Sequence, residues 1–483
     1  MNRDIAYRAD CFVRREAFGA LLTNRRGRIL SLDDLGGMIV AGLRPGWVDA
    51  EQLVRCVANQ LAVDEGGLRE SLTTLLRALV GTGLVERCEG PCACVEDEAV
   101  LRSMQAFEQT DPTPYPAVPH SLHLYLWNAC QQHCEFCYLP PSVRAEDSTE
   151  MDLDLIEHIV DQAAAMGTQI VNVIGGEPTL RPARLLEVLE RLDEKGLFAG
   201  FATNGGGVRA FSDNFVHALS RFPNLDVRFS IHARTPQLHD ALVGLKGSHA
   251  VACDSLRRML EVTGRASVSM VATRKNLHEV LPLLEWTEAV GATSFSLLAP
   301  LCEGDAEWYS RIAPSPSDYA EVLHHLAAYR EEGLLDVSFV DRWGVVHPLP
   351  ELRVVPMDYN CGAGMLFLEI APEGDVYPCS LTIGDDRFRL GNARSDSLED
   401  LWRSPVMKRF RERSSADLRS PGCQTCTDKE VCRGGCPMGA LKVYGDMNAG
   451  DPFCPRLDGF DAASAEASER RARVWASTVG SGE

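Results

Sequence analysis

Short stretches that favour strands open the chain, and stretches with helical periodicity follow them. The predicted strands are Phe12 to Glu16, Phe18 to Thr23 and Ile29 to Leu32. The predicted helices are Asp33 to Leu43, Ala50 to Leu61 and Leu68 to Leu79. A small sheet followed by helices is typical of winged-helix-like modules, so we expect residues 1–88 to form a domain of their own.

Between residues 89 and 119 the periodicity stops and prolines become frequent. They are Pro91, Pro112, Pro114, Pro116 and Pro119. We therefore predict a linker over residues 89–119. Cys88, Cys92 and Cys94 lie at its start, and we interpret them as linker cysteines, with transient metal binding as the alternative.

Strand and helix patterns alternate over residues 120–332. The predicted strands are Ser121 to Trp127, Gln169 to Ile174, Ala199 to Thr203, Asp226 to Ile231, Ser267 to Ala272 and Ser294 to Leu298. The predicted helices are Asp152 to Met166, Ala183 to Lys195, Asn214 to Arg221, Ser248 to Thr263, Leu277 to Val290 and Ser317 to Glu332. This alternation indicates an α/β fold with a parallel sheet. Because six units fall short of a closed eight-stranded barrel, we expect a partial (βα)6 barrel.

The regular pattern ends near residue 333. Residues 333–460 contain short strand candidates, glycines and cysteines, and residues 461–483, rich in Ala, Ser, Glu and Arg, predict a helix on the surface.

The amino-acid composition excludes one class of protein. With 45% hydrophobic residues in a chain of 483, the sequence excludes a disordered protein.

Charge is distributed unevenly along the chain. The 48 Lys and Arg against 68 Asp and Glu give a net charge of −20, which disfavours general nucleic-acid binding. The first 90 residues hold 12 Arg, no Lys and 12 acidic residues, so they are neutral and the acidic excess lies downstream. We therefore expect no nucleic-acid partner.

The start of the chain carries charges throughout and shows no apolar signal region. The longest apolar stretches, such as Leu35 to Leu43, are too short to span a bilayer. We expect a cytoplasmic protein without a membrane partner. In that reducing compartment, clustering among the 17 cysteines favours metal ligation over disulfides.

Three cysteines follow the first predicted barrel strand with the spacing CxxxCxxC: Cys130, Cys134 and Cys137. A four-iron cluster needs four thiolates for saturation, so three would leave one iron open to an outside ligand. The loop lies at the carboxyl end of a parallel strand, where α/β barrels place their chemistry. The alternatives are a zinc site with His133 as fourth ligand, or chance clustering.

The next predicted strand ends in Gly175, Gly176, Glu177 and Pro178. Glycines allow close approach of a ligand to the backbone, and the carboxylate is able to accept from an ammonium group. By itself this motif is also an ordinary turn. One βα unit after a CxxxCxxC loop, however, it resembles the radical S-adenosylmethionine (SAM) superfamily, and the resemblance covers residues 120–332.

In that superfamily SAM chelates the open iron and is cleaved to a 5′-deoxyadenosyl radical that abstracts hydrogen from the substrate. The resemblance implies that Cys130, Cys134 and Cys137 ligate the SAM cluster. It further implies two sets of SAM contacts: Phe136 against the adenine, and Gly175, Gly176, Glu177 and Pro178 at the methionine end.

Asn204 and Ser230 match SAM-pocket positions more loosely, with ordinary strand-end chemistry as the alternative. His232 stands where relatives commonly carry Asp, which makes it a candidate catalytic residue near the substrate. Cys302, Glu303 and Asp305 follow the last barrel strand. We predict Glu303, Asp305 and His232 as candidate general bases, and Cys302 as a hydrogen donor, a cluster ligand or a plain loop residue.

Seven further cysteines form an ordered series: Cys361, Cys379, Cys423, Cys426, Cys432, Cys436 and Cys454. The spacing does not fit a zinc ribbon and resembles the SPASM extension of peptide-modifying radical SAM enzymes. The resemblance implies two auxiliary four-iron clusters in residues 333–460. The distal one is ligated by Cys423, Cys426, Cys432 and Cys454, and the proximal one by Cys361, Cys379 and Cys436, with one iron open to substrate or to another ligand.

The N-terminal stretch from about residue 7 to 87 resembles leader-peptide recognition domains like the small D protein of pyrroloquinoline quinone biosynthesis. The residues that carry the resemblance are Phe12 to Leu22, Gly27 to Asp33 and the helices that follow. Such domains bind an extended leader by strand addition at a sheet edge. A DNA-binding winged helix is the alternative, and the neutral charge argues against it.

Together these patterns predict an enzyme that abstracts hydrogen from a ribosomally made precursor peptide and forms a thioether or carbon–carbon cross-link. A reducing partner such as flavodoxin or ferredoxin is implied. The close alternative is maturation of a larger protein, by subunit cross-linking or formylglycine formation. Ser380 disfavours the formylglycine reaction, because sulfatase-maturating relatives carry an acidic residue there. A non-catalytic iron–sulfur peptide-binding protein and a tRNA-modifying enzyme are the alternatives from other classes.

Overall fold

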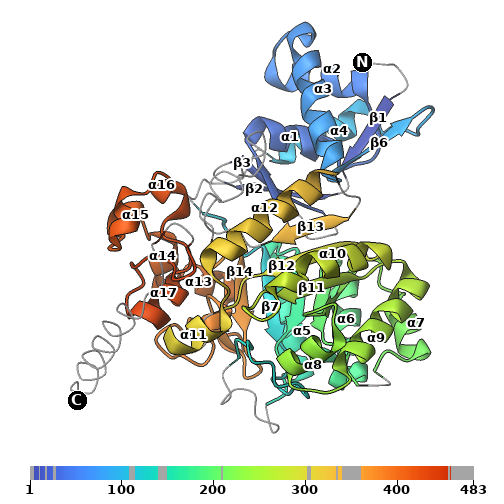
Figure 1. Cartoon of the computed structure of the whole chain (residues 1–483). Coiled ribbons are helices and arrows are strands. Elements are labelled where there is room, and N and C mark those ends of the chain that lie inside the picture. Colours follow the sequence, from blue (N-terminus) through green and yellow to red (C-terminus); the bar gives the residue numbers. More distant parts are fainter. Residues whose placement is uncertain are drawn as a thin grey trace. The chain divides into compact units, whose positions relative to one another are not determined.

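The computed structural model describes residues 5–9, 11–16, 19–24, 29–107, 115–139, 149–207, 210–301, 306–332, 335–339, 361–454 and 457. The chain divides into two compact units, Met1–Ala117 with Pro348–Asp358, and Val118–His347 with Tyr359–Glu483 (Figure 1). Each unit has a hydrophobic core of its own.

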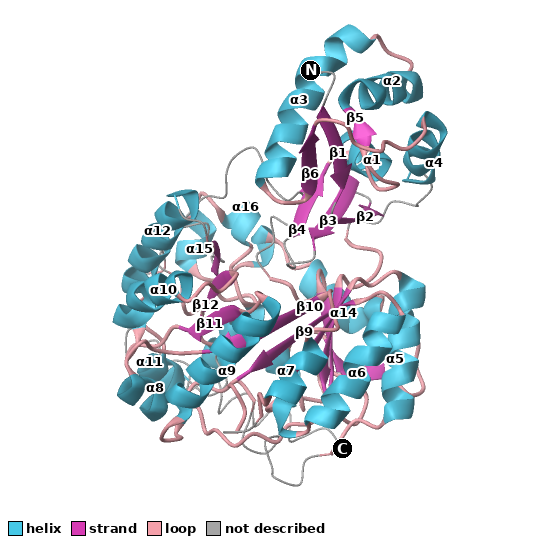
Figure 2. Ribbon diagram, turned by 90° about the vertical axis from the view of Figure 1, so that its right-hand side faces the viewer, coloured by secondary structure: helices cyan, strands magenta, loops and turns pink. Residues whose placement is uncertain are grey.

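In its described residues, the N-terminal unit combines two small antiparallel sheets with four helices (Figure 2). One sheet has the order β5(Val48–Asp49)-β1(Ile5–Ala9)-β6(Val85–Glu89), and the other β2(Cys11–Glu16)-β3(Gly19–Asn24)-β4(Ile29–Leu32). The helices are α1(Asp34–Gly42), α2(Ala50–Leu61), α3(Glu65–Gly81) and α4(Asp97–Phe107). The three strands and three helices predicted for residues 12–79 are present, and the structure adds β1, β5, β6 and α4.

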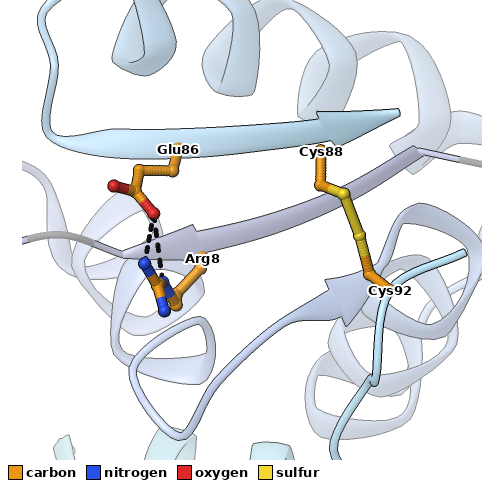
Figure 3. The surroundings of a disulfide bond; sticks show 4 residues. All are labelled: Arg8, Glu86, Cys88 and Cys92. Atoms are coloured by element: carbon orange, nitrogen blue, oxygen red, sulfur yellow. Dashed lines mark hydrogen bonds and ion pairs between the residues drawn. A yellow bond between two sulfur atoms is a disulfide. The ribbon is translucent and has the colours of Figure 1, made fainter. Parts of the chain in front are cut away.

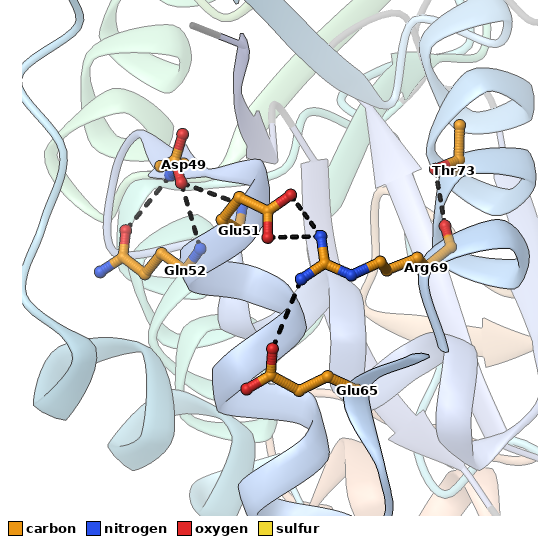
Figure 4. Close-up of polar contacts among 6 residues, drawn as sticks. All are labelled: Asp49, Glu51, Gln52, Glu65, Arg69 and Thr73. Carbon is orange, nitrogen blue, oxygen red and sulfur yellow. Dashed lines mark hydrogen bonds and ion pairs between the residues drawn. The ribbon is translucent and has the colours of Figure 1, made fainter. Parts of the chain in front are cut away.

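Polar side chains define where the helices of this unit begin. Asp49 caps α2 by accepting from the amides of Glu51 and Gln52, while the Gln52 side chain accepts from the Asp49 amide (Figure 4). Arg69 on α3 reaches Glu51 on α2 and Glu65 one turn earlier on its own helix. These contacts tie the second helix to the third at their exposed ends.

The prediction of a linker over residues 89–119 is wrong for residues 97–107, which form helix α4. Val100, Met104 and Phe107 are buried at helical spacing and belong to the core of the N-terminal unit. They fit against glycines of α1: a Cβ atom on Gly42 would lie 2.5 Å from Met104 Cε, and one on Gly37 would lie 2.5 Å from Phe107 Cζ. The frequent prolines around the helix concealed a short amphipathic pattern.

Cys88 and Cys92 also differ from the expectation of unpaired linker cysteines, because they form a disulfide (Figure 3). Cys88 belongs to β6, where it faces Ala6 of β1, and Gly90 at a φ of 104° turns the chain so that Cys92 comes back beside the strand. Cys94 is a free, exposed thiol. On the same strand pair, Arg8 donates to Glu86.

The second unit is built on a mostly parallel sheet, as the alternating pattern predicts. In the described residues it has ten strands in the order β13-β12-β11-β10-β9-β8-β7-β14-β15-β16. The six predicted strands are β7(Ser121–Tyr125), β8(Ile170–Ile174), β9(Phe198–Thr203), β10(Leu225–Ser230), β11(Ser267–Val271) and β12(Ser294–Leu298). The structure extends them on one side with β13(Asp336–Phe339) and on the other with β14(Phe367–Ile370), both parallel to their neighbours.

Helices follow the strands in sequence, and all of them except α8 contribute side chains to the core on the apolar face of the sheet. They are α5(Leu153–Met166), α6(Pro182–Glu194), α7(Asp213–Leu219), α8(Pro236–Val243), α9(Ser248–Thr263), α10(Val280–Ala289), α11(Ala306–Ile312) and α12(Pro316–Glu332). The strands alternate, so that Leu122 and Leu124 of β7 join this core while His123 lies on the opposite face. The opposite face carries polar side chains such as Asn172 and Arg228.

The C-terminal part continues the sheet and then folds into short helices. Strands β15(Asp375–Tyr377) and β16(Gly391–Asn392) are antiparallel additions beyond β14. Helices α13(Leu398–Trp402), α14(Pro405–Arg411), α15(Pro421–Thr425), α16(Lys429–Cys432) and α17(Pro437–Tyr444) follow. The predicted tail helix over residues 461–483 lies outside the described residues, and so does the stretch 340–360 that leads into the C-terminal part. Within the described part of the chain, no helix combines the length and apolar character needed to cross a membrane.

Candidate active site

The loop that carries Cys130, Cys134 and Cys137 follows β7 and is anchored on α8. The amides of His133 and Glu135 donate to the carbonyls of Val243 and Leu242. Two nitrogens point at the sulfur of Cys130, the Gln132 amide and Asn204 Nδ2, each at 3.5 Å. Cys130, Cys134 and Cys137 are all partly exposed residues.

Gly175 and Gly176 hold the next loop directly against this one. Gly175 has a φ of 113°, and a Cβ atom on Gly176 would lie 2.0 Å from the carbonyl oxygen of Ala129. The Gly176 and Glu177 amides donate to the carbonyls of Trp127 and Ala129. The glycines predicted to admit a ligand therefore also allow the two loops to interlock just before Cys130.

The Glu177 carboxylate, predicted to accept from an ammonium group, accepts hydrogen bonds from groups of the protein. Its Oε1 accepts from the Thr179 amide at 2.9 Å, the Thr179 hydroxyl at 2.6 Å and the Thr203 hydroxyl at 2.7 Å, and its Oε2 accepts from the Asn204 amide at 2.7 Å. Burial raises the pKa of Glu177, and these hydrogen bonds oppose the rise. Its side chain thus joins the loops that follow β8 and β9.

Asn204 lies where the sequence predicts a SAM-pocket residue. It is buried, accepts from Gln131 Nε2 at 2.8 Å and donates toward the Cys130 sulfur, so it spans two loops of the site. Ser230 ends β10 and is partly buried on the polar face of the sheet. The structure therefore brings Asn204 to the first cysteine loop and leaves Ser230 at the carboxyl end of a neighbouring strand.

His232 lies beside Phe136, with ring centroids 4.6 Å apart. Its Nδ1 accepts from the Val271 amide at 3.2 Å, which leaves the ring proton on Nε2. Burial, and then the neighbouring His239, hold the pKa of His232 well below its usual range. A neutral imidazole with Nδ1 occupied has no free lone pair, so this geometry argues against the general-base assignment of His232. The other catalytic candidates, Cys302, Glu303 and Asp305, lie outside the described residues.

The distal set of cysteines surrounds one hollow. Cys423, Cys426, Cys432 and Cys454 all line it, together with Gly434 and Asp451. Burial raises the pKa of Cys432 to about 11 and also raises the pKa of Cys423.

The buried guanidinium of Arg413 lies beside this hollow. It donates to the carbonyls of Gly435 at 3.0 Å and Ala449 at 2.9 Å. Its positive charge opposes the rise that burial causes in the pKa of Cys423. Four thiols with a buried cation beside them are a donor set that fits an iron–sulfur cluster, whose thiolates carry negative charge.

The proximal set also comes together from distant parts of the chain. Cys361, Cys379 and Cys436 belong to one small core cluster, and Cys436 caps α17 by accepting from the Gly439 amide. Burial raises the pKa of Cys379 well above its usual value, and the thiols of Cys436 and Cys361 raise it further. Cys436 is buried, and Cys361 and Cys379 are partly buried beside it. Three neighbouring thiols of this kind fit a cluster that replaces their protons with iron. In the described residues, no three His, Cys, Asp or Glu side chains are drawn together closely enough for a single metal ion.

Sequence reasoning missed a polar chain that joins the first cysteine loop to the proximal set. Tyr138 follows Cys137, and its hydroxyl lies 3.3 Å from the hydroxyl of Tyr125. Ser380, which follows Cys379, donates to Glu369 at 2.8 Å, and Glu369 in turn raises the pKa of both tyrosines. A lone glutamate within the otherwise apolar strand β14 was the signal that could have revealed this chain.

Comparison with known proteins agrees with these two groups of cysteines. Residues 124–287 match the model of the radical SAM superfamily, and residues 361–427 match that of SPASM, an iron–sulfur cluster-binding domain. The chain is therefore a radical SAM enzyme with an SPASM domain. These two domains imply a four-iron cluster that binds SAM, and auxiliary clusters in the C-terminal part.

Among individual proteins, the chain is similar to the mycofactocin maturase MftC of Mycobacterium ulcerans (strain Agy99). The two are 28% identical over 380 residues, which cover 78% of this chain and 97% of the relative. The PqqA peptide cyclase of Ruegeria pomeroyi (strain ATCC 700808 / DSM 15171 / DSS-3) is 27% identical over 361 residues, which cover 73% of this chain and 90% of the relative.

Among solved structures, Streptococcus suis SuiB bound to the precursor peptide SuiA has a TM-score of 0.64. It is 17% identical and covers 94% of this chain and 100% of its own. A coverage of this extent has to include most of residues 1–117, whereas the likeness at this identity concerns the fold alone.

Proposed function

We propose that this enzyme modifies a ribosomally made precursor peptide by radical chemistry, forming a thioether or a carbon–carbon cross-link. One observation carries the proposal: a CxxxCxxC loop interlocked with a Gly-Gly turn lies in the same unit as seven further cysteines, in a chain similar to a maturase and a peptide cyclase. The fold is also that of a protein solved with its precursor peptide.

We assign the residues as follows, with the cluster chemistry supplied by the bound groups. Cys130, Cys134 and Cys137 hold the SAM cluster; Cys423, Cys426, Cys432 and Cys454 hold the distal auxiliary cluster; and Cys361, Cys379 and Cys436 hold the proximal one. The cluster held by Cys130, Cys134 and Cys137 would supply one electron for the cleavage of SAM to methionine and a hydrogen-abstracting 5′-deoxyadenosyl radical. The chain orients SAM with Gly175 and Gly176, and Asn204 bonds the Cys130 sulfur.

The N-terminal unit is proposed to bind the leader of the precursor. Its two small antiparallel sheets leave edge strands such as β4 and β6, and strand addition at such an edge is a common way to bind an extended peptide. The neutral charge of the first 90 residues suits a peptide better than DNA. We further propose that a flavodoxin- or ferredoxin-type protein delivers electrons in the cytoplasm.

Co-expression tests this function directly. The enzyme is expressed with a short open reading frame adjacent to its gene, and the peptide is analysed by mass spectrometry. Cross-linking predicts the loss of two hydrogen atoms, absent when Cys134→Ala replaces the wild-type enzyme. Reconstituted enzyme that cleaves no SAM under reducing conditions would overturn the proposal, and so would peptides of unchanged mass with each adjacent reading frame.

A further inference from the structure

Glu369 is a fully buried carboxylate on β14, within a strand whose other side chains are apolar. Its Oε1 accepts from Ser380 Oγ at 2.8 Å and lies 3.1 Å from His123 Nδ1 on the neighbouring strand β7. Its Oε2 has no hydrogen-bond partner among the described residues. Burial of such a group is costly, so a function beyond packing is expected of it.

The position of Glu369 relates it to both groups of cysteines. Ser380, its donor, directly follows Cys379, and Glu369 raises the pKa of Cys379. It also raises the pKa of Tyr125 and of Tyr138, the residue after Cys137. One carboxylate therefore acts on the proximal cysteine set and on the end of the first cysteine loop.

Cationic compensation of this charge is limited in the described part of the chain. The basic side chain that the structure places against Glu369 is His123, which stacks on Phe367 with ring centroids 4.8 Å apart; a histidine carries a charge only when it is protonated. By contrast, the distal cysteines have the buried guanidinium of Arg413 beside them, together with Asp451. The two cysteine sets of the C-terminal part thus experience different fixed charges.

We propose that Glu369 is a positioning residue that lowers the reduction potential of the proximal auxiliary cluster. The inference rests on the proposed assignment of Cys361, Cys379 and Cys436 to that cluster. Reduction adds one electron, and hence one negative charge, to a group that already carries negative charge. A fixed carboxylate in a low-dielectric site opposes that addition, so the cluster stays oxidised at potentials that would otherwise reduce it.

The test is a mediated redox titration of reconstituted full-length enzyme, followed by electron paramagnetic resonance, with sodium dithionite as reductant. The proximal signal is identified as the one lost in a Cys379→Ala, Cys436→Ala double variant. Glu369→Gln is expected to shift the midpoint of that signal to a more positive potential, by more than it shifts the SAM-cluster signal. Glu369→Asp retains the charge and is expected to stay near the wild type.

Glu373→Gln is the matched control, because Glu373 is an exposed glutamate in the turn between β14 and β15. Its removal is expected to leave the proximal midpoint unchanged. A Glu369→Gln midpoint equal to that of Glu373→Gln overturns the inference while the proposed function stands. Wild-type enzyme whose iron content and spectrum show no cluster at Cys379 and Cys436 overturns the assignment itself.

Ser380→Ala provides a second measurement in case Glu369→Gln fails to assemble its clusters. The variant removes the hydroxyl donor, so the carboxylate beside Cys379 is less compensated. The proximal midpoint is then expected to move to a more negative potential. A midpoint unchanged or more positive in Ser380→Ala contradicts the inference.

Discussion

At the scale of single residues, Glu177 shows how a motif residue acts through its neighbours. The sequence places it after two glycines in a SAM-binding pattern, but its two oxygens accept four hydrogen bonds from Thr179, Thr203 and Asn204. The same side chain thereby orients Asn204, which bonds the sulfur of Cys130. Position in the chain predicted that Glu177 matters, whereas only the fold shows which groups it holds.

Replacing Glu177 by Gln is expected to destabilise the enzyme. The amide NH₂ of Gln would confront one of the buried donors, and a buried donor without an acceptor costs on the order of 2 kcal/mol. The expected result is a lower free energy of unfolding, measured by anaerobic urea denaturation, together with weaker SAM binding. Glu187→Gln, an exposed position on α6, is the control, and equal stability of the two variants would contradict the role of Glu177.

A row of three buried imidazoles begins beside Phe136, with His232 stacked on His239 and His249 edge-on to His239. The ring centroids of His232 and His239 are 5.7 Å apart, and those of His239 and His249 are 5.4 Å apart. Burial, followed by the neighbouring His249, lowers the pKa of His239 to about 4. All three are therefore neutral at physiological pH, in a region that the sequence analysis considered only for His232.

This row of imidazoles predicts a pH-dependent stability. The pKa of His239 is lowered on folding, so the unfolded chain binds more protons between pH 6.5 and about 4, and stability falls as the pH decreases through that window. The loss attributable to His239 is about 3 kcal/mol over the whole window, of which about 1.4 kcal/mol falls between pH 7.5 and 5.5. Denaturation of wild type and His239→Gln at pH 7.5 and 5.5 measures it: the variant is expected to lose less stability on acidification. The exposed His278→Gln serves as control, and parallel pH profiles of all three proteins would refute the assignment.

At the scale of elements, the periodicity of the sequence predicted the strands and helices, but it did not predict which distant strands are neighbours in the sheet. Strands β7 to β12 were predicted from alternating patterns because each has a helix on either side in sequence. Strand β14 was not assigned to the same sheet, since nothing local indicates that Phe367–Ile370 pairs with Ser121–Leu124. Likewise, the resemblance to SPASM domains grouped Cys379 with Cys436, but the hydrogen bond from Ser380, next to Cys379, to Glu369 depends on the position of β14 in the sheet.

Helix α4 was missed because its flanking prolines obscured it, and its role leads to a prediction. Met104 is fully buried against Gly42, so Met104→Ala is expected to destabilise the N-terminal unit by about 3 kcal/mol. Gln105→Ala, at the exposed neighbouring position, is expected to have little effect. Thermal denaturation followed by circular dichroism makes the comparison, and equal melting temperatures would show that α4 contributes nothing to this core.

At the scale of the whole molecule, the two units have separate cores and we assign them separate tasks. The N-terminal unit buries its own hydrophobic residues, and the described cysteines assigned to clusters all belong to the second unit. SAM cleavage and leader recognition are therefore expected to be separable. If the tasks are divided in this way, loss of one unit affects one activity.

An enzyme lacking residues 1–117 is expected to cleave SAM at a rate close to that of the full chain. Its apparent KM for the precursor peptide is expected to rise by about 100-fold or more, because the leader no longer tethers the substrate. Iron content and circular dichroism verify that the shortened chain is assembled. Unchanged peptide kinetics would rule out leader binding by the N-terminal unit, and lost SAM cleavage in a correctly assembled variant would contradict the division of tasks.

The pairing of β14 with β7 has a consequence for the order of events during synthesis. His123 and Glu369, partners in that pairing, are 246 residues apart in the chain. Until the later strand leaves the ribosome, β7 keeps one open edge next to the loop with the first three cysteines, and open edges invite wrong pairing. If iron reached that loop before residue 370 emerged, β14 would not yet be paired with β7, and the sheet that positions the loop would be incomplete. Correct loading of the SAM cluster is therefore expected to follow translation of the SPASM domain rather than precede it.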